Sequence, residues 1–304
     1  MKNARSATAS AAGALLLLAV TSTAGAAGNC DKACLEHIAD QYRAAYVRHD
    51  PAAVPLAKHL RFSENGVMMQ FPDASWDTVT REVGPATTIS DVKSGQVGVY
   101  TSIMQNDTPG FLAIRLKIEG GRITEIEHML TTKRNLSSPP TPIGDITTYQ
   151  PNPLFPPIVP AAQRLPRERL MHHATGYFDT LQNNTGEIRG TCFAPDATRI
   201  ENGLLFKDIE KGFRRGYYRF NNAVRREHLL VDEERQVVMS RGFIDHKGVL
   251  DEYTTTDGEK IHSVFREPQT WAFLEMFKIQ GDCIAGVQAV FIQAPYHMES
   301  PWKK

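Results

Sequence analysis

The sequence lacks the features that would attract a nucleic acid or a membrane. Its 34 basic and 34 acidic side chains give a formal net charge of zero, so the overall field favours neither polyanions nor an anionic bilayer. Beyond Cys30, no stretch approaches the roughly 18 apolar residues in a row that a membrane-spanning helix needs. We therefore expect a small molecule or another protein as partner, with no nucleic acid and no membrane.

Cysteine is scarce as well. The four cysteines have no zinc-site spacing, and we expect neither a metal nor another cofactor. In an exported chain such cysteines indicate disulfides, and three pairings are possible. We favour Cys30 with Cys34 and Cys192 with Cys283, because each pair then lies within one half of the chain.

The first residues have the pattern of a secretory signal peptide. Lys2 and Arg5 precede an apolar run from Ala14 to Val20, and small residues follow up to Ala27. The run is too short to span a bilayer. Residues 1–27 are therefore predicted to be cleaved, which would make the protein secreted or periplasmic.

The remaining chain is organised as two similar halves. The motif SENG at Ser63–Gly66 recurs as IENG at Ile200–Gly203, and LKIEGGRI at Leu116–Ile123 recurs as FKIQGDCI at Phe277–Ile284. Matches in the same order predict a tandem duplication. We place a first domain at 28–135 and a second at 167–304, the second with an inserted loop or lid at 245–269.

A proline-rich segment at 136–166 separates the halves, and residues 136 to 166 hold nine of the chain's 18 prolines. Such a segment is a semi-rigid linker. It is either a simple spacer or a strap across a pocket mouth or a domain seam.

Each half begins with a helix and continues with strands, which predicts an α+β fold. In the first half, apolar residues recur at spacings of three and four from Cys34 to about Asp50. A second short helix is expected at 52–58. Strand patterns follow at 60–69, 97–105, 111–118 and 122–131.

The segment from Trp271 to Asp282, WAFLEMFKIQGD, has the alternation of a strand followed by a turn. Trp271, Phe273 and Phe277 share one face with Glu275. A carboxylate among apolar side chains is usually neutral, paired or held for chemistry. The alternative is that this face is solvated and Glu275 points into water.

These motifs resemble the nuclear transport factor 2-like superfamily, and within it the SnoaL-like and ketosteroid isomerase branch. The resemblance implies two tandem cone-shaped domains, each with a curved mixed sheet packed on N-terminal helices around a pocket. It also implies that the two cones pack as an intramolecular pseudo-dimer. A further homodimer is possible on the same pattern.

The resemblance also implies catalytic roles. In the isomerase a tyrosine on the first helix stands eight residues before an aspartate, as Tyr42 does before Asp50, and Tyr177 is its counterpart in the second half. The stretch DATRIENG brings Glu201 to the position of the isomerase's base. EMFKIQG brings Glu275 to the position of its acidic oxyanion donor.

The second half is therefore expected to hold the active pocket, with Glu201, Tyr177 and Glu275 as catalytic residues. Its expected substrate-binding residues are His172, Arg199, Trp271, Phe273 and Phe277. In the first half Ile114 stands where Glu275 would be, so that pocket is expected to be degenerate or differently used, with polar residues Tyr42, Glu64 and His128.

The function expected from this set is cofactor-free proton transfer on a small, largely apolar carbonyl or hydroxyl compound. An ionised Glu201 would remove a carbon-bound proton, and Tyr177 with a protonated Glu275 would stabilise the oxygen that gains charge. Isomerisation and elimination both begin this way, so the enzyme would be an isomerase or a lyase. The alternatives are a non-catalytic binding protein and a water-activating hydrolase on the same scaffold.

Two other clusters were considered. The run FRRGYYRF at Phe213–Phe220 interleaves basic and aromatic residues, which can favour nucleic acids, but with zero net charge and export a solvated strand or helix face is the better interpretation. Asp245, His246 and His262 have metal-binding side chains, but no helical or strand spacing brings them together.

Overall fold

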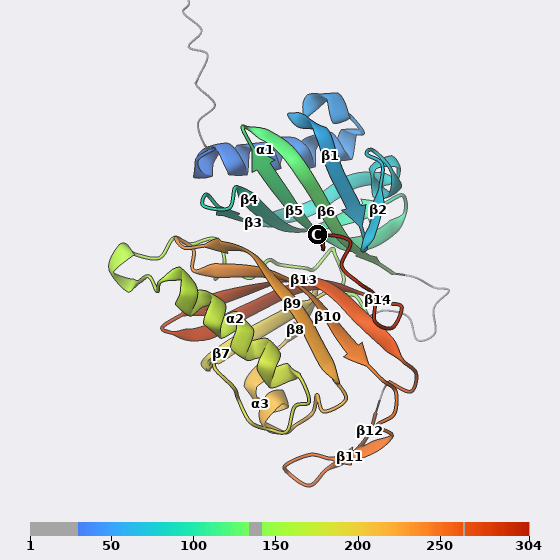
Figure 1. The fold of residues 1–304 in the computed structure, drawn as a ribbon, viewed down its shortest axis with the longest axis vertical. Coiled ribbons are helices and arrows are strands. Elements are labelled where there is room, and N and C mark those ends of the chain that lie inside the picture. Colours follow the sequence, from blue (N-terminus) through green and yellow to red (C-terminus); the bar gives the residue numbers. More distant parts are fainter. Residues whose placement is uncertain (1–29, 134–141, 264, 304) are drawn as a thin grey trace, which may run out of the picture.

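The computed structural model describes residues 30–133, 142–263 and 265–303. The predicted signal peptide at 1–27 lies outside these ranges, as does the beginning of the linker. Figure 1 shows one half of the chain above the other, with a long helix on each half.

The first helix, α1 (Lys32–Arg48), forms where the sequence predicts it. Asp31 caps it by accepting a hydrogen bond from the Cys34 amide at 2.9 Å, and the chain turns out of it at His49, whose backbone is left-handed. Its apolar face is buried (Leu35, Ile38, Ala39, Tyr42, Ala45, Tyr46).

The helix predicted at 52–58 is wrong. Only a short 3₁₀ turn, η1 (Pro51–Ala53), forms there, and Leu56 already begins a strand that pairs with Ile123. A partner about 67 residues away in the sequence decides this conformation, which local pattern does not reveal.

Each half contains a six-stranded mixed sheet, and the two sheets have the same strand order. The first sheet runs β2-β1-β6-β5-β4-β3 and the second β8-β7-β14-β13-β10-β9. The first sheet consists of β1 (Leu56–Glu64), β2 (Val67–Met69), β3 (Val79–Asp91), β4 (Gln96–Gln105), β5 (Thr108–Glu119) and β6 (Arg122–Thr132). The second consists of β7 (Phe193–Glu201), β8 (Leu204–Phe206), β9 (Ala223–Asp232), β10 (Val237–His246), β13 (Gln269–Gln280) and β14 (Cys283–Ala294).

The remaining elements complete the two halves. In the first half, η2 (Ala74–Asp77) follows β2. The second half begins with α2 (Arg167–Leu181), which η3 (Ala161–Gln163) precedes, and has a short helix, α3 (Ile209–Arg214), after β8. The fold-class prediction is confirmed: the protein is α+β, with two tandem domains that each combine a six-stranded mixed sheet with an N-terminal helix.

The inserted segment between β10 and β13 forms its own small hairpin, β11 (Glu252–Thr254) and β12 (Lys260–His262). It projects from the end of the second half that is remote from the first half (Figure 1). Tyr253 at its base is buried and donates a hydrogen bond to the Tyr217 carbonyl at 2.6 Å.

The two sheets pack against each other through one face each. Side chains from both sheets form a common apolar cluster, which includes Tyr100 and Phe111 of the first sheet and Met239, Leu274 and Met276 of the second. The two halves of the chain therefore pack against each other. This seam buries the Leu274 and Met276 face of β13. The other face lies inside the second half, where Glu275 is 5% exposed, so the alternative in which Glu275 points into water is wrong.

The described part of the linker, 142–166, lies in that seam. Ile146, Tyr149 and Phe155 are buried members of the cluster between the sheets, and the Tyr149 hydroxyl accepts a hydrogen bond from Gln288 at 2.7 Å. The structure thus favours the interpretation of this segment as a strap across the domain seam, and not as a simple spacer.

The C-terminal tail also crosses the seam, and the C-terminal end lies between the halves in Figure 1. Trp302 donates a hydrogen bond to Ser63 at 3.0 Å and lies 4.5 Å from the Arg61 and Arg115 guanidinium carbons. Beside it, Glu127 of the first sheet accepts a hydrogen bond from the Nε of Arg241 of the second at 2.6 Å. Apolar burial and charge pairing therefore both join the halves.

Two buried aspartates connect the halves reciprocally. Asp91 at the end of β3 accepts the Val231 amide at 3.0 Å, and Asp232 at the end of β9 accepts the Ser90 amide at 3.2 Å. Each carboxylate also binds a cation at the start of the other half's helix, Arg167 for Asp91 at 2.6 Å and Lys32 for Asp232 at 3.1 Å. This is the contact pattern of a two-fold interface.

Both predicted disulfides are present, Cys30–Cys34 and Cys192–Cys283, and they indicate an oxidising compartment. Among the described residues, none of the helices combines the length and the hydrophobicity that crossing a bilayer requires.

We predict that Asp91→Ala and Asp232→Ala each lower the free energy of unfolding by about 3 kcal/mol, because each leaves a buried backbone N–H of the other half unpaired and takes a carboxylate away from a neighbouring cation. Burial opposes ionisation, but hydrogen bonds from Arg167 and the Val231 amide outweigh it and hold the pKa of Asp91 below its usual 3.8. The stabilisation is therefore present above that pH and is lost as the pH falls through the lowered pKa.

Urea unfolding at pH 7 and pH 3 measures this. The matched control is Glu233→Ala, which removes a pair with Lys93 whose side chains are 66% and 34% exposed and should cost less than about 1 kcal/mol. Equal effects of Asp91→Ala and Glu233→Ala would contradict the prediction.

Candidate active site

The second cone encloses a cavity of about 580 Å³, a size suited to a small organic ligand. Its walls come from α2, the strands of the second sheet, the turn after α3 and the inserted segment. They are formed by Pro142, Tyr177, Leu181, Arg199, Glu201, Leu204, Phe206, Tyr217, Tyr218, Phe220, Asn221, Ile244, His246, Phe265, Trp271, Phe273, Glu275, Ala289 and Phe291. Most of these side chains are apolar or aromatic, and the polar ones come from α2, β7, the turn after α3, β10 and β13.

Glu275 lies in the middle of β13, on the face that the alternation of the strand predicts. It is 5% exposed and lines the cavity beside Phe273. Desolvation raises the pKa of this carboxyl well above its usual 4.5, and the negative charge of Glu201 raises it further, while Arg199 opposes the shift. Burial therefore favours the protonated form of Glu275, which can donate a hydrogen bond.

Glu201 ends β7, immediately before the turn at Asn202 and Gly203. Both turn residues have left-handed backbones, and the Asn202 side chain holds the turn to β14 by two hydrogen bonds of 3.0 Å with Phe291. The sequence thus orients Glu201 into the cavity, where its side chain keeps 20% exposure.

The charge on Glu201 is balanced by Arg199, two residues earlier on the same strand face. The Arg199 Nε lies 2.8 Å from a carboxylate oxygen of Glu201. Burial raises the pKa of Glu201 above its usual value, and Arg199 opposes that rise. The two acids of the cavity therefore have different environments, since Glu201 has a cation beside it and Glu275 lies among aromatic rings.

Tyr177 projects from α2 into the same cavity and is 1% exposed. Its hydroxyl accepts a hydrogen bond from Nη1 of Arg199 at 3.3 Å, while Nη2 of Arg199 donates to the Tyr218 hydroxyl at 2.9 Å. The three expected catalytic residues thus lie around one cavity, and Arg199 links two of them.

Several cavity residues were missed from the sequence. Tyr217, Tyr218 and Phe220 line the cavity, so the interpretation of Phe213–Phe220 as a solvated face is wrong for its aromatic residues. Of the basic residues in the run, Arg214 faces solvent with 62% of its side chain exposed, whereas the Arg215 side chain is 25% exposed. Three aromatic residues within four positions were the available signal.

His246 and Phe265 were also missed. The His246 ring lies against that of Phe265, 4.0 Å between centroids, and both line the cavity. Phe265 belongs to the inserted segment, so the insertion contributes to the cavity wall. Burial lowers the pKa of His246 to about 4, which keeps the ring neutral at neutral pH.

Two expected binding residues lie elsewhere. His172 is exposed on the outer side of α2, and its neighbour His173 is the buried one, 2.9 Å from Asp282. Phe277 packs in the core with ring centroids 5.0 Å from Tyr177 and 5.2 Å from Phe178, and it does not line the cavity. Trp271, Phe273 and Arg199 lie where they were expected.

The first cone uses the same positions differently. In the first sheet, His128 of β6 is the register partner of Glu64 on β1 and of Ile114 on β5. In the second sheet, Ala289 of β14 is the register partner of Glu201 on β7 and of Glu275 on β13. These registers confirm that Ile114 occupies the position of Glu275.

In the first cone the His128 ring fills the space that Ala289 leaves open in the second. It lies 2.8 Å from the Tyr42 hydroxyl and 3.3 Å from Glu64, and Trp76 donates to the same hydroxyl at 3.0 Å. Tyr42 and His128 are 0% exposed. Tyr42, Glu64 and His128 are thus brought together as predicted, but as a closed polar core and not as a ligand pocket.

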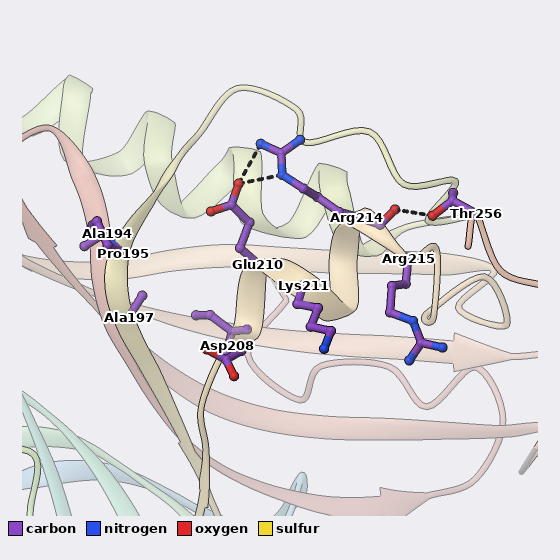
Figure 2. Close-up of a pocket in the computed structure, with 10 residues that line it drawn as sticks. Ala194, Pro195, Ala197, Asp208, Glu210, Lys211, Arg214, Arg215 and Thr256 are labelled. Carbon is purple, nitrogen blue, oxygen red and sulfur yellow. Dashed lines mark hydrogen bonds and ion pairs between the residues drawn. The ribbon is translucent and has the colours of Figure 1, made fainter. Parts of the chain in front are cut away.

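A second hollow, of about 640 Å³, lies beside α3 (Figure 2). Two of its charged groups, Arg214 and Glu210, pair at 2.6 Å, and the Thr256 hydroxyl donates to the Arg214 carbonyl at 2.8 Å. None of the described residues that line this hollow is aromatic, and the aromatic cavity is therefore the stronger candidate.

Comparison with known proteins gives a similarity of fold. Residues 163–291 match the family described as "Domain of unknown function (DUF8021)", and no curated protein matches the sequence. Three solved structures illustrate the likeness. A nuclear transport factor 2-like protein from Anabaena variabilis is 16% identical (TM-score 0.29, covering 41% of this chain and 91% of that one).

A candidate isomerase from Rhodopseudomonas palustris is 8% identical (TM-score 0.29, 42% of this chain and 91% of that one). A candidate ketosteroid isomerase from Kribbella flavida is 13% identical (TM-score 0.24, 40% and 91%). At these values the comparisons carry no argument about activity. The chain is similar in fold to nuclear transport factor 2-like proteins, and its second half matches a family whose function is not described.

Proposed function

We propose that the second cone is the active site of an exported, cofactor-independent enzyme that removes a carbon-bound proton from a small, largely apolar carbonyl or hydroxyl compound. The observation that carries this proposal is the placement of two carboxyls with different environments in one aromatic cavity. Two acids whose surroundings separate their protonation can act as base and as hydrogen-bond donor in the same reaction.

In the proposed reaction the Glu201 carboxylate accepts a proton from a carbon next to a carbonyl. The electrons of that C–H bond form a carbon–carbon double bond, and the carbonyl oxygen takes up the negative charge. The Glu275 hydroxyl donates a hydrogen bond to that oxygen. Return of the proton to another carbon gives isomerisation, whereas departure of a leaving group gives elimination.

Tyr177 would be the second donor to the same oxygen. Its hydroxyl already accepts a hydrogen bond from Arg199, and donation from a cation makes the phenol a better donor in turn. Arg199 is thus a positioning residue in the proposal, because it orients both Tyr177 and Glu201.

The second candidate function is ligand binding without turnover. The ion pair with Arg199 favours it, since a carboxylate 2.8 Å from a guanidinium is a weaker base than a free one. The two functions differ in one measurable event, which is exchange of a carbon-bound proton with solvent.

We predict that the protein accelerates deuterium incorporation at the acidic CH₂ of 2-tetralone in D₂O, followed by NMR, and that Glu201→Gln lowers the rate at least about 100-fold because the base is lost. Binding of 2-tetralone should change little. Glu64→Gln, at the matching register position of the first cone, should keep the rate. Exchange that survives Glu201→Gln would contradict the assignment of the base, and binding with no exchange in the unaltered protein would favour the binding function.

Glu275→Gln is expected to be milder than Glu275→Ala, because glutamine keeps an N–H donor near the reacting oxygen. Loss of the donor in the alanine variant should cost about 3 kcal/mol of transition-state stabilisation, seen as a lower kcat for exchange. Equal losses in the two variants would show that the hydrogen bond is not what Glu275 contributes.

The exchange rate should show a bell-shaped dependence on pH. It should rise as Glu201 loses its proton, at a pH above 4.5 because burial raises that pKa, and fall where Glu275 ionises at still higher pH. Arg199→Gln removes the charge that lowers the pKa of Glu201, so it should move the acidic limb to higher pH. An acidic limb that stays in place or moves to lower pH would contradict this role.

A further inference from the structure

The charge inside the aromatic cavity can be counted from its lining. Apart from tyrosines, the ionisable side chains that line it are Arg199, Glu201, His246 and Glu275. Arg199 belongs to β7 with Glu201, His246 ends β10, and Glu275 lies on β13. No lysine or aspartate is among the lining residues.

Arg199 is the cation of the cavity, and three protein groups surround its guanidinium. Its Nε faces Glu201 at 2.8 Å, Nη1 donates to Tyr177 and Nη2 to Tyr218. The guanidinium is 6% exposed, and its carbon lies 5.1 Å from the ring centroid of Phe206 and 5.4 Å from that of Tyr218. A ligand carboxylate or phosphate would have to compete with the negative charge of Glu201, 2.8 Å from the Arg199 Nε, to bind it.

The other two groups are Glu275 and His246, and burial favours the neutral form of each by raising the pKa of Glu275 and lowering that of His246 to about 4. His246 lies between Phe220 and Phe265. With both groups neutral, the cavity contains one ion pair and no net charge, and most of its other lining is apolar or aromatic. An ionic ligand would lose its hydration there without gaining a counter-ion.

We propose that Arg199 is a built-in counter-ion for Glu201 and that the pair restricts the cavity to uncharged ligands, excluding carboxylates and phosphates. The inference names the substrate class of the proposed active site and rests on that site being the ligand cavity. It does not depend on turnover, because the selection operates in binding.

A matched pair of probes tests the proposal. 2-Acetylnaphthalene is uncharged, and 2-naphthoate has the same ring system with an anionic group; each is titrated into the full-length protein by calorimetry at pH 7.5. The unaltered protein should bind the ketone at least about tenfold more tightly than the anion. Equal or tighter binding of 2-naphthoate overturns the proposal.

The Glu201→Gln variant gives the sharper result, since glutamine keeps the shape of the side chain and leaves the charge of Arg199 without a counter-ion. Its affinity for 2-naphthoate should rise about tenfold or more, with the affinity for 2-acetylnaphthalene nearly unchanged. The double variant Arg199→Gln, Glu201→Gln restores neutrality and should return the anion affinity to its original value.

Unchanged 2-naphthoate binding in Glu201→Gln overturns the counter-ion role, and so does failure of both probes to bind in every variant that circular dichroism shows to be folded. These outcomes are distinct from failure of the proposed catalysis. A protein that shows the charge switch but no deuterium exchange into 2-tetralone would support the uncharged-ligand site and refute the enzyme.

Discussion

Everything in the structure depends on the packing of the two sheets against each other. The common apolar cluster removes one face of each sheet from water, and apolar burial of this kind is the main favourable term in folding and association. The reciprocal aspartates, Asp91 and Asp232, fix the two halves in one orientation, since each needs a backbone amide from the other half. With that face occupied, the opposite face of each sheet is the one that packs on a helix and forms the interior of the cone.

The two interiors show how one backbone plan can be filled in two ways. The pairing registers are the same, yet His128 in the first cone stands where the second has Ala289. An imidazole in that position joins Tyr42 to Glu64 and closes the core. In the second cone the methyl group of Ala289 leaves that space open, and Arg199 contacts both Tyr177 and Glu201. Differences at a few inward positions, His128 against Ala289 and Ile114 against Glu275, therefore accompany a packed core in one cone and a cavity in the other.

The proposed chemistry and the inferred ligand class follow from the same electrostatic condition. A buried acid beside aromatic rings is neutral, and a buried acid beside a guanidinium is charged but paired. Together they give a cavity without net charge that still contains a base and a donor. Arg199 is central to this balance, because it lowers the pKa of the base and also removes the attraction for anions.

The duplicated α+β plan, helix α1 and the grouping of Tyr177, Glu201 and Glu275 could be predicted from local periodicity, motif order and a family resemblance. The two disulfide pairs were the favoured choice among three possible pairings. Prediction from the sequence failed where distant partners decide. Leu56 is a strand residue because it pairs with Ile123, and strand β3 was not predicted. His172 lies on the protein surface instead of in the cavity. The cavity wall instead includes Tyr218, His246 and Phe265. Only the tertiary structure decided that β13 is buried on both faces and that Arg199 neutralises Glu201. The physical reason is that burial, and with it the protonation of an acid, depends on what packs against a residue from other parts of the chain.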